Sequence, residues 1–227
     1  NILLAGFSDG SVFAQLDNTT LVRFTAAGVQ AETFKVMDSS YIVNAKKVPG
    51  ADCIITIGYD QSLNIIRLDG GTWRKHPYTF TMNIKPMCNM AISRDGTTLA
   101  VGGYNPNNFP TAVVNIYDIA RIVSWTDGGD SSLFSASKLG SWSISGGTAY
   151  ALEFSPDKSR LYTSIYSDAA AKCNILTLGL SFNSGNTSCS TSLLGAWNMT
   201  GVYSELIATP DGTGLIYIEG DTLKIMD

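Results

Sequence analysis

The chain repeats itself at an interval of about 50 residues, and this repeat constrains its fold more than any other feature. Five apolar segments share one pattern, and four of them have Asn or Lys at the second position and Ile at the third. Successive segments begin 51, 51, 59 and 50 positions apart. They are Val12-Phe13-Ala14-Gln15, Leu63-Asn64-Ile65-Ile66, Val114-Asn115-Ile116-Tyr117, Cys173-Asn174-Ile175-Leu176 and Leu223-Lys224-Ile225-Met226. Each unit is therefore predicted to be one small supersecondary element that packs on its neighbours.

A second motif precedes the repeated segment in three units. It opens with Ser or Thr, carries Asp at the third position and ends on Leu at the seventh. The hydroxyl and the carboxylate can bond the local backbone, and Gly at the fourth position allows a positive φ, so the motif predicts a hairpin turn between two strands. Apolar residues alternate on both sides of it, which is the pattern of strands. The three copies are Ser93–Leu99, Ser155–Leu161 and Thr209–Leu215.

Together the two motifs predict an all-β chain, a β-propeller of four-stranded antiparallel blades. With the strands of a blade lettered a to d from the centre outward, the turn joins a to b and the repeated segment is strand c. About five blades are expected, three complete and two partial, because the first unit begins at strand b (Ile2–Phe7) and the last stops after strand c. The units are approximately residues 1–36, 37–84, 85–147, 148–200 and 201–227, either one propeller domain or an excerpt of a propeller with six to eight blades.

Two stretches carry a family resemblance. Phe154-Ser155-Pro156-Asp157 with the following Leu161-Tyr162, and Val114-Asn115-Ile116-Tyr117-Asp118-Ile119, resemble the blade signatures of YVTN-type and tryptophan–aspartate repeat propellers. The resemblance covers roughly residues 50–227. Tyr117-Asp118 stands where the Trp-Asp pair would be and no Gly-His pair precedes a strand, so the Asp–His–Ser–Trp network of the classical repeats is expected to be absent. Divergent propellers of this kind occur on bacterial surfaces, in bacteriophage tails and in extracellular assemblies, and the resemblance implies a binding or scaffolding role.

Composition narrows the classes of partner. Charged residues make up 15% of the chain and the net charge is −4, with Lys and Arg scattered singly, so no basic surface for nucleic acid is expected. No stretch approaches the ~20 apolar residues of a membrane-spanning helix, and no signal peptide is recognised. The chain begins at Asn1, which favours a processed product or an excerpt. An extracellular, cell-surface or virion location is favoured over the cytoplasm.

The residues available for catalysis are few. His76 is the single histidine and is expected in a solvated loop or at a strand end, and no paired Cys or His spacing supplies a metal site. Glu153 and Glu205 are expected at equivalent positions of strand a, facing the central channel. There they could bind a cation or act as acid and base, or simply face water. We predict no catalytic residues, no metal and no cofactor.

The four cysteines are Cys53, Cys88, Cys173 and Cys189. The strand assignments place Cys53 and Cys88 at opposite ends of their strands, and Cys173 and Cys189 at opposite ends of a hairpin, too far apart for disulfides. Free buried thiols are therefore expected.

Two adjacent b–c connections are longer than the others and form the candidate binding surface. The third unit inserts a loop between Tyr104 and Pro110, and the fourth inserts one after Tyr166. Exposed aromatic residues anchor many interfaces, and Asn side chains supply adaptable hydrogen bonds. The candidate residues are Tyr104, Asn105, Asn107, Asn108, Phe109, Tyr166 and Asp168. Two tolerated solvent loops are the alternative.

These features predict a non-enzymatic propeller that acts as a structural or protein-binding module in a larger assembly, such as a surface appendage or a bacteriophage tail. Its partners would be other protein chains of that assembly, with a glycan as a further possibility. The alternative is an extracellular propeller that binds or processes glycans. An enzyme would gather several carboxylates, Arg or a metal around one pocket, and the sequence shows only scattered groups.

Overall fold

The computed structural model describes residues 2–38, 40–124, 132–167, 172–199, 205–219 and 222–226. Within these ranges the side chains of residues 87–89, 132–134, 172 and 219 are not described. The chain forms two compact units, residues 1–82 and 83–227, and each is described by itself. In the described ranges no helix is long and apolar enough to cross a lipid bilayer.

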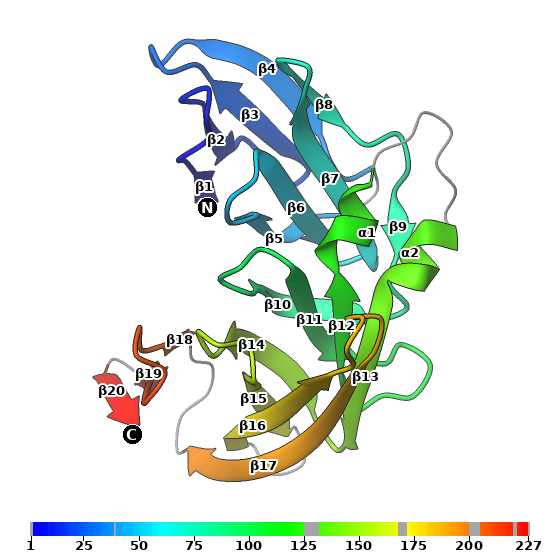
Figure 1. The fold of residues 1–227 in the computed structure, drawn as a ribbon, viewed down its shortest axis with the longest axis vertical. Helices are drawn as coiled ribbons and strands as arrows, with labels where there is room; N and C mark the ends of the chain where they lie inside the picture. The colour runs from blue at the N-terminus through cyan, green and yellow to red at the C-terminus, as the bar shows by residue number, and fades with distance from the viewer. Residues whose placement is uncertain are drawn as a thin grey trace. The chain divides into compact units, whose positions relative to one another are not determined.

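The first unit contains two antiparallel sheets whose strands follow chain order (Figure 1). The inner strands alternate between faces and bury their apolar side chains, as in β6, where every residue is buried. The first sheet consists of β1 (Leu3–Leu4), β2 (Val12–Gln15), β3 (Thr20–Phe24) and β4 (Gln30–Lys35). The second consists of β5 (Ile42–Lys47), β6 (Cys53–Gly58), β7 (Ser62–Asp69), β8 (Thr72–Lys75) and β9 (Phe80–Thr81).

The first sheet corrects the sequence-based strand assignment. Ile2–Phe7 was expected to be strand b and Val12–Gln15 strand c, but β1 and β2 are the first and second strands of a four-stranded sheet. The strand missed by the sequence is β4, whose residues are exposed or half-buried and therefore lack an apolar pattern. The described chain thus has four sheets of at least four strands and one of three, in place of three complete and two partial blades.

The outermost position of the second sheet is shared by two strands. β8 pairs with the half of β7 from Ile66 to Asp69, and β9 pairs with Ser62 and Leu63. His76 lies in the break between them, with its amide donating to the Ile65 carbonyl at 2.8 Å. The strand-end position expected for His76 is therefore correct, but the side chain is 3% exposed and not solvated.

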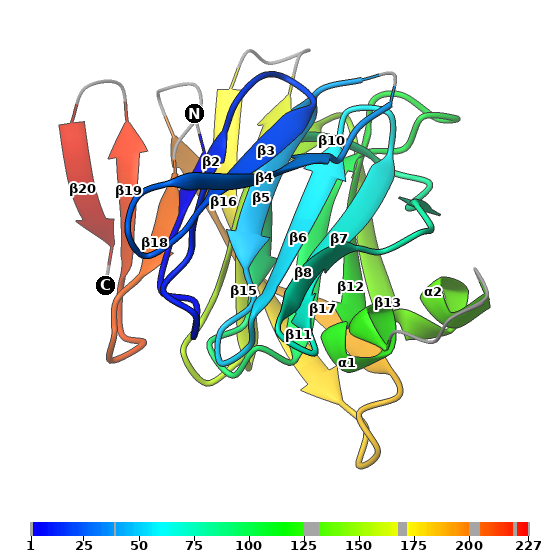
Figure 2. The ribbon, with the colours of Figure 1, turned by 90° about the horizontal axis from the view of Figure 1, so that it is seen from above.

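The second unit contains three antiparallel sheets in chain order (Figure 2). Four of the five repeated segments lie in the third strand of their sheets, as the repeat predicts. One of them is in β7 of the first unit, and the other three are in the second unit. The third sheet consists of β10 (Lys85–Ile92), β11 (Thr98–Tyr104), β12 (Thr111–Asp118) and β13 (Lys138–Ser145). The fourth consists of β14 (Thr148–Phe154), β15 (Arg160–Ser167), β16 (Lys172–Phe182) and β17 (Cys189–Met199). The fifth consists of β18 (Leu206–Ala208), β19 (Leu215–Glu219) and β20 (Thr222–Met226).

The predicted hairpin turns have the predicted chemistry. In the first copy the Ser93 hydroxyl donates to Asp95 Oδ1 (2.5 Å) and accepts from the Thr98 amide (3.0 Å), and Asp95 Oδ1 accepts from the Thr97 amide (3.0 Å). The same three bonds recur in the other two copies. The fourth position has a positive φ each time, 71° at Gly96, 63° at Lys158 and 75° at Gly212.

Two short helices between β12 and β13 were not expected from the sequence. They are α1 (Ile119–Val123) and α2 (Ser132–Ser137), and residues 125–131 between them lie outside the described residues. Asp118 caps α1, because its Oδ1 accepts from the Ala120 amide at 2.9 Å. The aspartate of the Tyr117-Asp118 pair thus starts a helix.

The apolar cores lie between neighbouring sheets within each unit. In the first unit the rings of Phe7, Phe13 and Trp73 meet edge to face, with centroids 4.7 to 5.3 Å apart. In the second unit one cluster joins the third and fourth sheets through residues such as Ala100 and Leu152, and another joins the fourth and fifth. Burial of such faces is the main favourable term that holds sheets together.

Three cysteines lie where the strand assignments placed them. Cys53 begins β6, and in the hairpin of β16 and β17 Cys173 pairs with Met199 while Cys189 pairs with Phe182. Cys173 and Cys189 therefore occupy opposite ends of the hairpin, and all three side chains are buried thiols. The side chain of Cys88 lies outside the described residues.

Candidate functional site

The loop between β11 and β12 is held by its own backbone and by Asn105. The Asn105 amide donates to the Thr111 carbonyl (2.9 Å), which continues the hairpin ladder by one step, and its carbonyl accepts from the Asn108 amide (3.2 Å). Asn105 Oδ1 accepts from the Asn107 amide at 2.9 Å. Asn side chains favour such local turns, so the sequence Asn-Pro-Asn-Asn folds into a defined loop.

This loop presents an aromatic pair. The rings of Tyr104 and Phe109 meet edge to face, with centroids 5.1 Å apart and planes at 77°. Phe109 is 58% exposed, whereas Tyr104 is half-buried. Edge-to-face contact is a favoured geometry between aromatic rings, so Tyr104 holds Phe109 in place while most of the Phe109 ring faces solvent.

A second aromatic pair lies at the start of the neighbouring hairpin. Tyr166, the penultimate residue of β15, is half-buried and meets Tyr150 of β14 at 6.1 Å and 80°. Gly147, just before β14, lies close to the backbone of β15, because a Cβ there would be 2.8 Å from the Tyr166 carbonyl oxygen. Tyr150 is not among the residues predicted from the sequence to bind a partner, although the alternation along residues 148–154 identifies it as a strand residue. Asp168 lies outside the described residues.

Tyr104 and Tyr166 lie at the same edge of the second unit. Each stands at or near the end of the second strand of its sheet, and β14 packs directly against β10 and β11. Asn107 and Asn108 are exposed beside Phe109, and Asn105 is half-buried. Of the seven residues predicted to form the patch, the structure thus describes six on two adjacent hairpins.

The two glutamates do not occupy equivalent positions. Glu153 is half-buried on β14, pairs with Tyr162 and stands two residues before the turn residue Ser155. Glu205 is exposed ahead of β18 and stands four residues before Thr209, so its counterpart on β14 is Ala151. The hairpin turns set the strand register, and counted from them the two glutamates fall two positions apart, so the expected equivalence was wrong.

The remaining groups with catalytic potential are dispersed. His76 Nδ1 accepts from the Tyr78 amide at 3.1 Å, and burial lowers the pKa of this histidine below its ordinary value. In the part of the chain that the structure describes, no three His, Cys, Asp or Glu side chains are grouped closely enough to hold a metal ion.

No family model matches the chain, and no curated protein matches it in sequence. Two solved structures are similar in fold. The β-propeller domain of Cps50 (Swd1) from Myceliophteria thermophila has a TM-score of 0.64 and 10% identity over 98% of this chain and 68% of that one. The hydrazine synthase of Kuenenia stuttgartiensis has a TM-score of 0.69 and 14% identity over 98% of this chain, which spans 63% of that chain's length. Identities this low establish the fold alone.

The described sheets have the structure that the repeat predicted. Each is antiparallel, its strands follow chain order, and adjacent sheets within a unit pack through apolar faces. The chain is a β-propeller.

Proposed function

We propose that this chain is a non-catalytic propeller module that binds another protein through the β11–β12 loop and the adjoining edge at Tyr166. The observation that carries the proposal is the exposure of Phe109 on a loop that is already ordered. An exposed aromatic ring removes its apolar area from water only when a partner covers it, at about 25 cal/mol per Å².

Order in the loop favours binding as well. Three hydrogen bonds centred on Asn105 and the contact with Tyr104 hold the loop before any partner arrives. A preordered surface loses less conformational entropy on association than a flexible one. The amides of Asn107 and Asn108 can satisfy polar groups around the aromatic centre, which is the usual composition of an interface rim.

A non-catalytic role is consistent with the surroundings of the titratable residues. The single histidine is buried among aromatic rings, and the two glutamates considered for channel chemistry differ in exposure and register. We extend the proposal to an assembly on a cell surface or in a virion, on the basis of the sequence resemblance given above.

The test places a photoreactive phenylalanine analogue at position 109 and, as a matched control, at position 29. Val29 is 61% exposed in the first unit and has no part in the proposed surface. Irradiation in the native extract should crosslink one partner polypeptide from position 109 and none from position 29, and mass spectrometry identifies it.

Affinity for the identified partner then decides the proposal. Phe109→Ala should weaken binding by about 1–3 kcal/mol, with a smaller effect for Asn107→Ala at the rim. Circular dichroism and the melting temperature serve as the folding control for both variants. Equal affinity of the wild type and Phe109→Ala would refute the proposal.

A further inference from the structure

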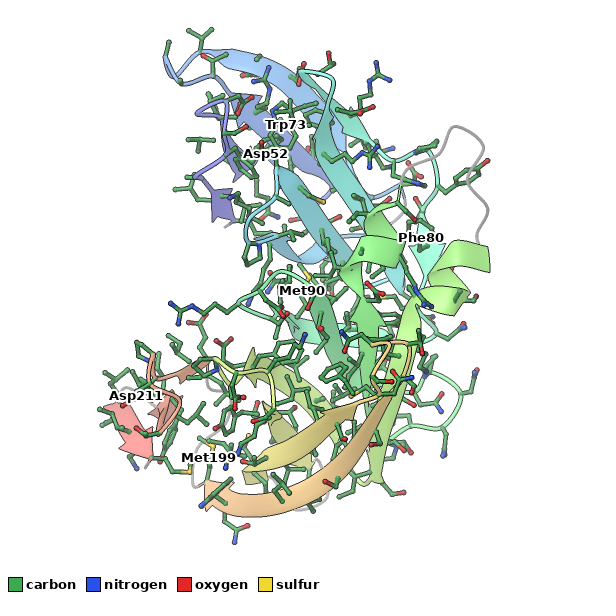
Figure 3. All side chains as sticks on the ribbon, in the orientation of Figure 1. Asp52, Trp73, Phe80, Met90, Met199 and Asp211 are labelled. Carbon is green, nitrogen blue, oxygen red and sulfur yellow. The ribbon has the colours of Figure 1, made fainter. Side chains whose placement is uncertain are left out.

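A cavity of about 260 Å³ lies between the fourth and fifth sheets of the second unit. Strands β15, β16 and β17 form one wall, and Leu215 of β19 and Met226 of β20 contribute the other. Figure 3 labels Met199 at the end of β17, in the fourth sheet, and Asp211 in the turn between β18 and β19, in the fifth sheet. Pockets for drug-sized ligands measure roughly 300–1,000 Å³, so this one suits a smaller molecule, about one ring in size.

A glycine opens the cavity. Tyr162, Thr177 and Gly195 are directly paired across β15, β16 and β17, and side chains in such a row share one face of the sheet. Gly195 has no side chain to cover its neighbour in the row. The indole of Trp197 lies next to the gap, since a Cβ on Gly195 would be 3.4 Å from Trp197 Cη2.

The Thr177 hydroxyl at the base of the row is buried and without a partner. Thr177 is 3% exposed, and among the described residues its Oγ1 makes no hydrogen bond. A buried hydroxyl without a partner destabilises the folded state. Because Thr177 lines the cavity, a ligand there can supply the missing hydrogen bond.

The other lining groups define the class of ligand. Trp197 is 41% exposed and offers an apolar ring face, while the Arg160 side chain, which forms no ion pair with the described residues, offers hydrogen-bond donors. An apolar ring face beside hydroxyl and guanidinium groups suits a pyranose, which has an apolar face of C–H groups and an equatorial belt of hydroxyls. A purely apolar ligand would leave Thr177 unsatisfied.

The charges around Arg160 favour a neutral ligand over an acidic one. Asp157 and Asp211 lie in the turns beside it and line an adjoining cavity together with Arg160. Hydrogen bonds from Ser155 and from Thr209, respectively, hold the pKa of each carboxyl below its ordinary value, so both are ionised at neutral pH. Two carboxylates offset the single guanidinium.

We infer that this cavity binds a neutral hexose, stacked on Trp197 and hydrogen-bonded to Thr177 and Arg160. The site is separate from the protein-binding loop proposed above, and variants in one leave the other intact. A protein-binding propeller with this second site would recognise a terminal or branching sugar on its partner or on a nearby glycan.

The test uses saturation-transfer difference NMR with the methyl glycosides of glucose, galactose, mannose and N-acetylglucosamine. At least one should bind in the millimolar range, and glucuronate should bind more weakly than glucose. Trp197→Ala should abolish the signal. Leu193→Ala is the matched control, because Leu193 is 50% exposed on the same strand but does not line the cavity, and it should bind as the wild type does.

The decisive variant is Thr177→Val, which keeps the shape of the side chain and removes the hydroxyl. It should weaken sugar binding by about five- to tenfold, the loss of one hydrogen bond, while the melting temperature stays equal or rises because an unsatisfied polar atom has been removed. If Thr177 had only a structural role, Thr177→Val would bind the sugar as tightly as the wild type does.

Besides unchanged sugar binding by Thr177→Val, three results would overturn the inference. The first is that none of the four glycosides binds, and the second is that glucuronate binds more tightly than glucose. The third is that an extended hexapeptide with alternating Val and Thr binds in place of the sugars, and that its binding depends on Trp197. That result would indicate that the cavity binds an extended peptide beside β20.

Discussion

The indole Nε1 of Trp73 donates a hydrogen bond of 2.7 Å to Oδ2 of Asp9, and this bond joins the two sheets of the first unit. Asp9 also accepts from the hydroxyl (2.7 Å) and the amide (2.9 Å) of Ser11. The sequence predicted that the Asp–His–Ser–Trp network of the classical repeats would be missing. The structure contains a shorter Trp–Asp–Ser connection that needs no histidine, made by residues outside the stretches that carry the resemblance.

Replacing Trp73 by Phe should destabilise the first unit by about 1.5–3 kcal/mol, the range for a hydrogen bond to a charged group. The ring contacts with Phe7 and Phe13 would be kept in part, so the loss reports mainly on the bond to Asp9. Burial by itself raises the pKa of Asp9, but the bonds from Trp73 and Ser11 outweigh it and hold the pKa below its ordinary value. Urea unfolding measures the stability, and a carboxyl titration by NMR should show that pKa rising in the variant. An unchanged titration would contradict this account.

Ser155→Ala should cost about 1–3 kcal/mol, because the buried hydroxyl accepts from the Arg160 amide at 2.9 Å and donates to Asp157 at 2.6 Å. The bond from Ser155 is the largest cause that lowers the pKa of Asp157 from 3.8 to about 2. A lowered pKa in the folded state stabilises the fold above the unfolded value and loses that contribution as the pH falls through the folded value. The stability difference between wild type and variant should therefore narrow between pH 4 and pH 2, which urea unfolding at a series of pH values would measure.

Lys158→Gly should be more stable than Lys158→Ala by about 1 kcal/mol, because this residue has a φ of 63° and the left-handed region disfavours a Cβ. Both variants lose the bonds of 2.9 Å from Lys158 Nζ to Asp95 and Thr97, so their difference isolates the backbone. Gly212→Ala, at the equivalent turn position with a φ of 75°, is the reverse control and should lose a similar amount. Thermal unfolding that ranks Lys158→Ala above Lys158→Gly would disprove the argument.

Gly103→Ala should be among the most destabilising single substitutions in the second unit, with a loss of about 3 kcal/mol or more. A Cβ at this position would lie 2.0 Å from the Lys85 carbonyl oxygen, and the backbone of β10 would have to move. Gly185→Ala is the matched control, since its Cβ would meet nothing closer than 3.7 Å, at Thr187. Differential scanning calorimetry should show a large drop for the first variant and a change within error for the second.

Local chemistry explains which parts of the fold were predictable. The turn beginning at Ser93 closes through bonds among residues two to five positions apart, so its sequence specifies its geometry wherever it occurs. Third strands such as β7 and β12 bury most of their residues and keep the apolar pattern of the repeat. Strand β4 escaped prediction because an outermost strand buries little and has no pattern to keep. The split between β8 and β9 escaped it because the break at His76 depends on packing.

The candidate sites also differ in how far local sequence predicts them. Tyr104 and Phe109 are five residues apart, so their pairing follows from one loop and was open to prediction from the chain. The predicted equivalence of Glu153 and Glu205 was wrong, because Glu153 stands two residues before its hairpin turn and Glu205 stands four residues before the next one. The cavity beside Trp197 could not be foreseen, because it depends on residues from five strands of two sheets and on a glycine that faces a threonine across the sheet.

By itself the sequence determined the class of fold, the repeat interval, the turns and most inner strands, since these depend on side-chain alternation and on bonds between near neighbours in the chain. The tertiary structure alone decided the hydrogen bond from Trp73 to Asp9, the ion pair from Lys158 to Asp95 and the unsatisfied hydroxyl of Thr177. The ion pair and the Trp73 bond connect residues about 60 positions apart, and the state of Thr177 depends on a neighbour that lacks a side chain. A local sequence pattern does not indicate which side chains come into contact when two sheets pack. These contacts can therefore be identified only in the folded chain.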